Sequence, residues 1–164
     1  ILTGWVVLVV YFFVVFHQPQ NWFERIPVES LQKFLRLALL YSSFAFIITL
    51  VREVVKDIED IEGDRKYGCR TMPIVWGTDF ARVFAATWLV ILLVLLLVVF
   101  FYILQFRMWV PAFYNLLMVL VPAAYCFYLL TKAKATTDYT YLSRWIKGVI
   151  FTGILSMLLF KIFG

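Results

Sequence analysis

The sequence has few charged residues, one histidine and two cysteines. Charged side chains make up 15% of its 164 residues, whereas hydrophobic ones make up 64%. An average soluble domain is nearer 25% charged, and a soluble chain of this size has no interior large enough to bury so much apolar surface. Because Cys69 lies in a polar stretch and Cys126 in an apolar run, we expect no disulfide between them, and neither cysteine has the spacing of a metal ligand.

The sequence also lacks any sustained alternation of polar and apolar residues, which excludes strands as the main element. Instead, five apolar runs approach the roughly 20 residues that a membrane-spanning helix needs. These runs are residues 1–16, 37–55, 84–104, 110–130 and 145–163. We therefore predict an all-α fold, a polytopic transmembrane helix bundle in a lipid bilayer. We also expect a separate interfacial helix over residues 28–36 and a kink at Pro122.

The net charge of +5 arises from basic residues that are dispersed among the apolar runs, so we expect no nucleic-acid partner. Ten of the 15 lysines and arginines fall on the side of the membrane that carries the loop following the second run. Cytoplasmic loops carry an excess of lysine and arginine. The count therefore predicts that this loop, over residues 52–73, lies on the cytoplasmic face.

That loop holds most of the negative charge. Six of the ten acidic residues lie between Glu53 and Asp64. If one helix continues past Gly63, an arc of about 60° on its surface holds four carboxylates. They belong to Glu53, Asp57, Asp60 and Asp64, while Glu59 and Glu62 point elsewhere.

Such an acidic face is unfavourable by itself, because like charges one turn apart repel and a helix C-terminus is already partly negative. A divalent cation would relieve the repulsion, and hard carboxylate oxygens with no histidine or cysteine nearby suit Mg²⁺ best. Neighbouring basic residues would then meet phosphate oxygens of a ligand that shares the metal. The alternative is a charged helix end that is simply solvated at the membrane surface.

The pattern Asp57-x-x-Asp60-x-x-x-Asp64, followed by Gly68 and Thr71-Met72-Pro73, resembles the second conserved motif of the UbiA superfamily of intramembrane prenyltransferases. The wider string R-E-x-x-K-D-x-E-D-x-x-G-D is most similar to the branch of geranylgeranylglycerol-phosphate geranylgeranyltransferases, also called digeranylgeranylglyceryl phosphate synthases.

The resemblance implies a bundle of about nine transmembrane helices, of which this chain supplies the last five. Residues 1–164 are then the C-terminal portion of a single transmembrane prenyltransferase domain. The family's first motif, N-D-x-x-D, is absent from these residues, and the chain opens at Ile1 inside an apolar run. We therefore expect the N-terminal half of the same protein to supply the other metal site.

The function implied by the resemblance is Mg²⁺-dependent transfer of a polyprenyl group from a prenyl diphosphate to a membrane-associated acceptor. The preferred reaction moves geranylgeranyl to geranylgeranylglycerol phosphate, in a bacterial or archaeal plasma membrane. The metal ligands and catalytic residues would be Asp57, Asp60 and Asp64. The residues binding the diphosphate would be Lys56, Arg65, Lys66 and Arg70. An aromatic quinone precursor is the alternative acceptor.

Other residues receive weaker assignments. Arg52 and Glu53 pair either with groups of the site or as a structural ion pair. Gly63 and Gly68 are expected to let the helix end and the loop turn. A loop on the same side of the membrane would hold three residues at the mouth of the site, namely Asp138, Tyr139 and Tyr141.

Two functions of other classes compete with the enzyme. A noncatalytic membrane subunit derived from this family would lack the first motif altogether. A channel or transporter segment would place acidic residues along several helices. The third and fourth apolar runs contain no acidic residue, which argues against the channel.

Overall fold

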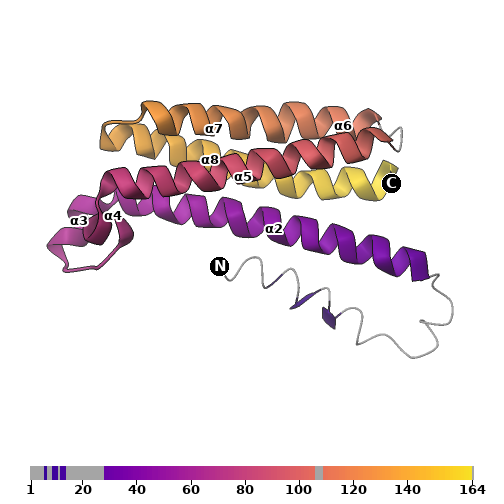
Figure 1. Cartoon of the computed structure of the whole chain (residues 1–164), viewed down its shortest axis with the longest axis horizontal. Helices are drawn as coiled ribbons and strands as arrows, with labels where there is room; N and C mark the ends of the chain where they lie inside the picture. Colours follow the sequence, from indigo (N-terminus) through magenta and orange to yellow (C-terminus); the bar gives the residue numbers. More distant parts are fainter. Residues whose placement is uncertain (1–5, 7–8, 11, 14–27, 106–108, 164) are drawn as a thin grey trace. The chain divides into compact units, whose positions relative to one another are not determined.

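The computed structural model describes residues 6, 9–10, 12–13, 28–105 and 109–163, and two compact units divide the chain, residues 1–49 and 50–164. The elements are helical throughout the described part (Figure 1). They are α2 (Val28–Glu59), α3 (Ile61–Lys66), α4 (Met72–Trp76), α5 (Thr78–Gln105), α6 (Trp109–Tyr114), the π-helix η2 (Asn115–Leu120), α7 (Val121–Lys132) and α8 (Thr136–Phe163). The predicted all-α fold is confirmed.

Three stretches of helix in the described residues are long and apolar enough to cross a membrane. They are Ala38–Glu59, Thr78–Gln105 and Trp109–Lys132. They correspond to the second, third and fourth predicted runs, and α8 covers the fifth. The first predicted run falls largely outside the described residues.

Two predicted connections were wrong. Residues 28–36 form no separate helix, because α2 runs from Val28 to Glu59 and its sequence contains no glycine or proline that would interrupt it. The predicted loop over residues 131–144 is only a short turn, since α7 ends at Lys132 and α8 begins at Thr136. The three residues expected in that loop therefore lie in the first turns of α8.

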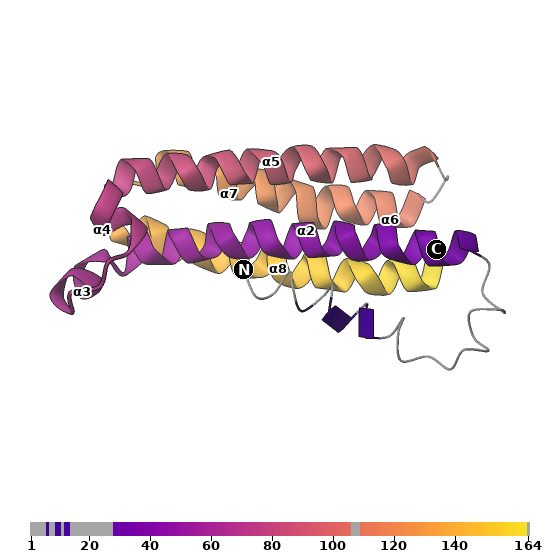
Figure 2. The ribbon, with the colours of Figure 1, turned by 60° about the horizontal axis from the view of Figure 1, so that its bottom comes forward.

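Within residues 50–164, α5 packs against α7, and α7 packs against α8 (Figure 2). Every third or fourth residue of α5 is buried. The buried residues are Ala81, Ala85, Leu89, Leu92, Leu96, Val99 and Ile103. This spacing places one stripe along the helix. The alanines at its start are fully buried, and small residues allow transmembrane helices to approach closely.

The fourth run departs from an α-helix just before Pro122. The π-helix η2 spans Asn115–Leu120, and Pro122 lies in the first turn of α7. Proline has no N–H, and its ring crowds the carbonyl one turn earlier, so a wider turn relieves the crowding. The structure thus has a π-helix before Pro122, while the kink at Pro122 stays a prediction. The π-helix also holds the buried Asn115, whose Oδ1 has no hydrogen-bond partner in the described structure.

Glycine ends the helix that follows α2, although only one of the two expected glycines does so. At the end of α3, the N–H of Cys69 donates to the carbonyl of Asp64 at 2.9 Å, and that of Gly68 donates to Arg65 at 3.3 Å. This pair of bonds is a Schellman motif, which needs a left-handed residue at Gly68, where φ is 71°. Gly63 instead lies inside α3, so its predicted role in ending the helix was wrong.

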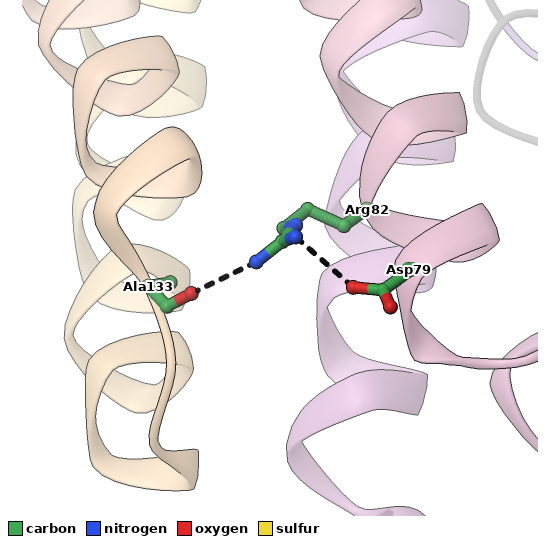
Figure 3. A network of polar contacts seen from close by, with 3 residues as sticks. All are labelled: Asp79, Arg82 and Ala133. Atoms are coloured by element: carbon green, nitrogen blue, oxygen red, sulfur yellow. Dashed lines mark hydrogen bonds and ion pairs between the residues drawn. The ribbon is translucent and has the colours of Figure 1, made fainter.

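Two hydrogen bonds of Arg82 stabilise the end of the bundle where α5 begins. The Arg82 guanidinium donates to the carbonyl of Ala133 at 3.3 Å and to the Asp79 carboxylate at 3.0 Å (Figure 3). Ala133 is the buried C-cap of α7, so Arg82 satisfies a carbonyl that the helix leaves without an intrahelical donor. The positive charge also suits the negative end of the α7 dipole.

The two glycines give a matched pair of predictions. Gly68→Ala should lower the free energy of unfolding by about 1 kcal/mol, because a side chain is strained at positive φ. Gly63→Ala should raise it by up to about 1 kcal/mol, because alanine favours the helix and a Cβ there meets nothing within 4 Å. Thermal unfolding in detergent micelles would measure both, and equal shifts for the two variants would contradict the Schellman assignment.

Arg82→Met should lower the free energy of unfolding by about 1–3 kcal/mol, since the buried Ala133 carbonyl loses its donor. Asp79→Asn is the control, because the Asp79 side chain is 89% exposed and an exposed ion pair contributes less than about 1 kcal/mol. Equilibrium unfolding of both variants would measure the difference. An Asp79→Asn loss as large as that of Arg82→Met would show that the ion pair, and not the cap, is what matters.

Candidate functional site

The acidic residues lie on two consecutive helices, the end of α2 and the short α3. Asp60 is the single residue between them, and its φ of −91° and ψ of 6° are not helical. The N–H of Asp60 donates to the Lys56 carbonyl, and that of Asp64 to the Asp60 carbonyl, both at 2.9 Å. These bonds join Asp60 to the last turn of α2 and to the first turn of α3. Gly63 lies inside α3, but α2 and α3 are not the single continuous helix that the sequence predicted.

The structure brings the predicted carboxylates near one another. Asp57 is partly buried and interacts electrostatically with three acidic neighbours, Glu53, Asp60 and Asp64. These are the four residues that the helical spacing assigned to one face. Asp60 is exposed and Asp64 partly so, which leaves the face open to a ligand from outside the helix.

Glu53 differs from the three aspartates because it has a cation partner. The Arg52 guanidinium forms an ion pair with the Glu53 carboxylate at 2.7 Å. Two roles were predicted for Arg52 and Glu53, pairing with groups of the site or with each other. The structure shows the ion pair between them. Among the described ion pairs, none involves Asp57, Asp60 or Asp64. The uncompensated charge of the face therefore lies on the aspartates.

The donor set of this face suits a hard cation. In the described part of the chain, no three histidine, cysteine or acidic side chains are gathered closely enough to hold a metal by themselves. Mg²⁺ does not need such a cage, since it is commonly bound by one or two carboxylates together with waters and substrate phosphates. Three partly or fully exposed aspartates without cation partners fit that mode of binding.

Four basic residues lie in the same segment as the acidic face. Lys56, Arg65, Lys66 and Arg70 are all exposed, and none forms an ion pair within the described residues. Lys56 lies near Asp57, and Arg65 and Lys66 occupy the last turn of α3. Positive groups that are not neutralised by the protein remain available for an anionic ligand.

The turn after Gly68 contains Thr71, which the sequence motif includes but to which we assigned no role. Thr71 is the N-cap of α4, yet its side chain makes no capping bond, and its buried Oγ1 has no hydrogen-bond partner in the described structure. A buried hydroxyl without a partner is uncommon. The signal was available in the sequence, because a threonine two residues before Pro73 is typical of a helix start.

The three residues expected at a loop mouth have different environments. The Asp138 carboxylate accepts hydrogen bonds from the N–H groups of Lys134 and Ala135, both at 3.0 Å, and so caps α8. Those bonds lower the pKa of Asp138 below its usual range. Tyr139 is buried, and Tyr141 is exposed beside Trp145. Asp138 therefore has a structural role that its position explains.

Comparisons with known proteins agree with the motif. Residues 1–148 match the UbiA prenyltransferase family. The chain is 33% identical over 117 residues to a digeranylgeranylglyceryl phosphate synthase of Natronomonas pharaonis, a match covering 71% of this chain and 39% of the relative. It is 45% identical over 56 residues to the synthase of that name in Methanothermobacter thermautotrophicus, covering 34% of this chain and 20% of the relative.

A synthase of the same name from Methanosphaera stadtmanae is 49% identical over 53 residues, which are 32% of this chain and 20% of the relative. The chain thus spans well under half the length of these relatives. No solved structure matches it significantly. The motif at the end of α2, the apolar helices and the match over residues 1–148 lead to one conclusion: this chain is an integral membrane protein that belongs to the UbiA prenyltransferase family.

Proposed function

We propose that the complete polypeptide carrying this chain transfers a prenyl group from a prenyl diphosphate to a membrane-associated acceptor. One observation carries the proposal: three aspartates that form no ion pair among the described residues interact electrostatically at the end of a membrane span, in a segment with four exposed cations. The activity is proposed for the complete polypeptide because the chain spans 39% of the relative that it matches most extensively among those described above.

The preferred donor and acceptor are geranylgeranyl diphosphate and geranylgeranylglycerol phosphate. The relatives named digeranylgeranylglyceryl phosphate synthase support this choice. An aromatic quinone precursor is the alternative acceptor, and no feature of the described residues favours it. The excess of basic residues on this side of the bundle supports a cytoplasmic site in the plasma membrane.

In this proposal, Asp57, Asp60 and Asp64 would supply carboxylate oxygens to Mg²⁺, which would complete its coordination with waters and diphosphate oxygens. When bound, magnesium neutralises charge that develops on the diphosphate. The exposed side chains of Lys56, Arg65, Lys66 and Arg70 bind the remaining phosphate oxygens. They also keep the released diphosphate from leaving before the acceptor has reacted.

The proposed reaction breaks the bond between the allylic carbon and the diphosphate oxygen, and the electron pair leaves with the diphosphate. The acceptor hydroxyl oxygen forms the new carbon–oxygen bond and releases its proton to solvent. The acidic face lies at the end of α2, where the span Ala38–Glu59 reaches its last residue. A diphosphate bound there remains near the membrane surface while its apolar chain stays in lipid.

Asp60→Asn should lower Mg²⁺-dependent turnover of the complete protein by at least about 100-fold, because loss of a metal ligand removes several kcal/mol of charge stabilisation. Glu62→Gln is the matched control: it removes one negative charge from the same segment, and Glu62 is exposed and off the acidic face. It should change turnover by less than about threefold. Radiolabelled prenyl transfer in proteoliposomes would measure both.

Full activity in Asp60→Asn would remove the metal-ligand assignment from that residue. Absence of prenyl transfer in the complete wild-type protein, with either a glycerol phosphate or an aromatic acceptor, would instead favour the noncatalytic membrane subunit.

A further inference from the structure

Away from the acidic face, α7 and α8 share an exposed cluster of aromatic side chains. Tyr125 contacts the Trp145 ring edge-on at 5.0 Å and stacks on Tyr128 at 6.3 Å. Tyr141 contacts Trp145 at 6.3 Å. All four residues are between 36% and 54% exposed. Tyrosine and tryptophan present an apolar ring and a polar tip, which suits the boundary between lipid tails and headgroups.

Two cations complete this surface. The Lys132 ammonium lies 5.8 Å from the centroid of the Tyr128 ring. Arg144 is exposed, lies directly before Trp145 and is three residues after Tyr141, which places it on the same side of α8. We call the six residues the aromatic–basic face: Tyr125, Tyr128 and Lys132 of α7, and Tyr141, Arg144 and Trp145 of α8.

Among the residues that the structure describes, no acidic side chain forms an ion pair with the aromatic–basic face. Neither Lys132 nor Arg144 takes part in the ion pairs of the described residues. The acidic residue closest in sequence is Asp138, whose carboxylate already accepts two backbone hydrogen bonds. The face therefore carries two positive charges that the described protein does not balance, and its charge complements an anion.

The depth of Arg144 in the membrane indicates the source of that anion. The Tyr125–Trp145 contact and the hydrogen bond from the Tyr114 hydroxyl to the Thr152 carbonyl, at 3.0 Å, align α8 with the span Trp109–Lys132. Arg144 therefore lies level with the interior of that span, about 12 Å along α8 from Thr136. An exposed cation at such a depth needs an anion or water.

Geometry favours an anion at the headgroup level. Side chains of a helix lean toward its N-terminus, so Arg144 reaches back toward the level of Tyr141 and Lys132. One turn deeper on the same side of α8, Gly148 is exposed, and a Cβ built there meets nothing within 4 Å. The surface below the cations is thus open enough for an acyl chain.

We propose that the aromatic–basic face binds the headgroup of an anionic phospholipid of the surrounding bilayer. Lys132 and Arg144 contact the phosphate, a tyrosine hydroxyl donates to one of its remaining oxygens, and an acyl chain lies along the surface at Gly148. The site uses none of the residues of the acidic face and does not depend on prenyl transfer.

Native mass spectrometry of the complete protein in detergent, titrated with phosphatidylglycerol or phosphatidylcholine, tests the proposal. The wild type should retain phosphatidylglycerol preferentially. With about a fivefold contribution from each cation, Lys132→Gln/Arg144→Gln should bind phosphatidylglycerol about 30-fold more weakly, with no change for phosphatidylcholine. Lys134→Gln is the matched control, because Lys134 is exposed in the adjacent turn but outside the face, and it should bind like the wild type.

Arg144→Lys keeps the charge and should stay within about threefold of the wild type. If the double variant does not fold, the wild type alone decides, because its affinity for phosphatidylglycerol should fall as salt rises from 0.05 to 0.5 M. Equal retention of the two lipids by the wild type would overturn the proposal. So would equal phosphatidylglycerol binding by wild type and double variant, because the lipid would then bind without the two cations.

Discussion

The candidate site depends on two hydrogen bonds that join Asp60 to the turns on either side of it. Asp60 donates to Lys56 in α2 and accepts from Asp64 in α3. Across this junction, Asp57 interacts electrostatically with Asp60 and Asp64. Loss of the two bonds would let α3 rotate, and the same sequence would then scatter its carboxylates. The repulsion among them is the cost of this arrangement, and it makes the face receptive to a cation.

The surrounding turns fix the length and direction of that short helix. Gly68 ends α3 in a left-handed conformation, and α4 follows within a few residues before α5 begins at Thr78. Near the start of α5, Arg82 donates a hydrogen bond to the carbonyl of Ala133, the C-cap of α7. Most charged side chains of residues 50–164 therefore lie at one end of the apolar helices. Along the rest of their length, these helices are stabilised by apolar packing. This separation is expected in lipid, where polar groups within the membrane must be satisfied by protein.

Much of this was predictable because membrane helices and acidic spacing follow short-range rules. The all-α class followed from apolar runs, and the grouping of Glu53, Asp57, Asp60 and Asp64 followed from helical periodicity. Errors occurred at helix boundaries. Residues 28–36, predicted as a separate interfacial helix, are the start of α2. Asp138, predicted in a loop, caps α8, because a polar N-terminal turn resembles a loop in composition alone. The role of Gly63 was mispredicted for a similar reason. A glycine inside a helix and a glycine that ends one differ in φ, which the sequence does not give.

The cross-helix features could not be predicted from one sequence. The contact between Tyr125 and Trp145 and the bond from Arg82 to Ala133 each join residues far apart in the chain, and their register is set by packing. The ion pair of Arg52 with Glu53 depends on rotamers as well as on spacing. It is nevertheless informative, because it removes Glu53 from the set of free carboxylates.

The central claim is that the aspartates of α2 and α3 hold a divalent cation. Electron paramagnetic resonance of Mn²⁺, a paramagnetic substitute for Mg²⁺, would test it in the complete protein with a non-hydrolysable prenyl diphosphate analogue present. We expect that Asp57→Asn/Asp64→Asn binds fewer Mn²⁺ ions than the wild type, and that Mg²⁺ displaces the Mn²⁺ that the wild type binds. Identical Mn²⁺ binding curves for the wild type and a folded double variant would contradict the account.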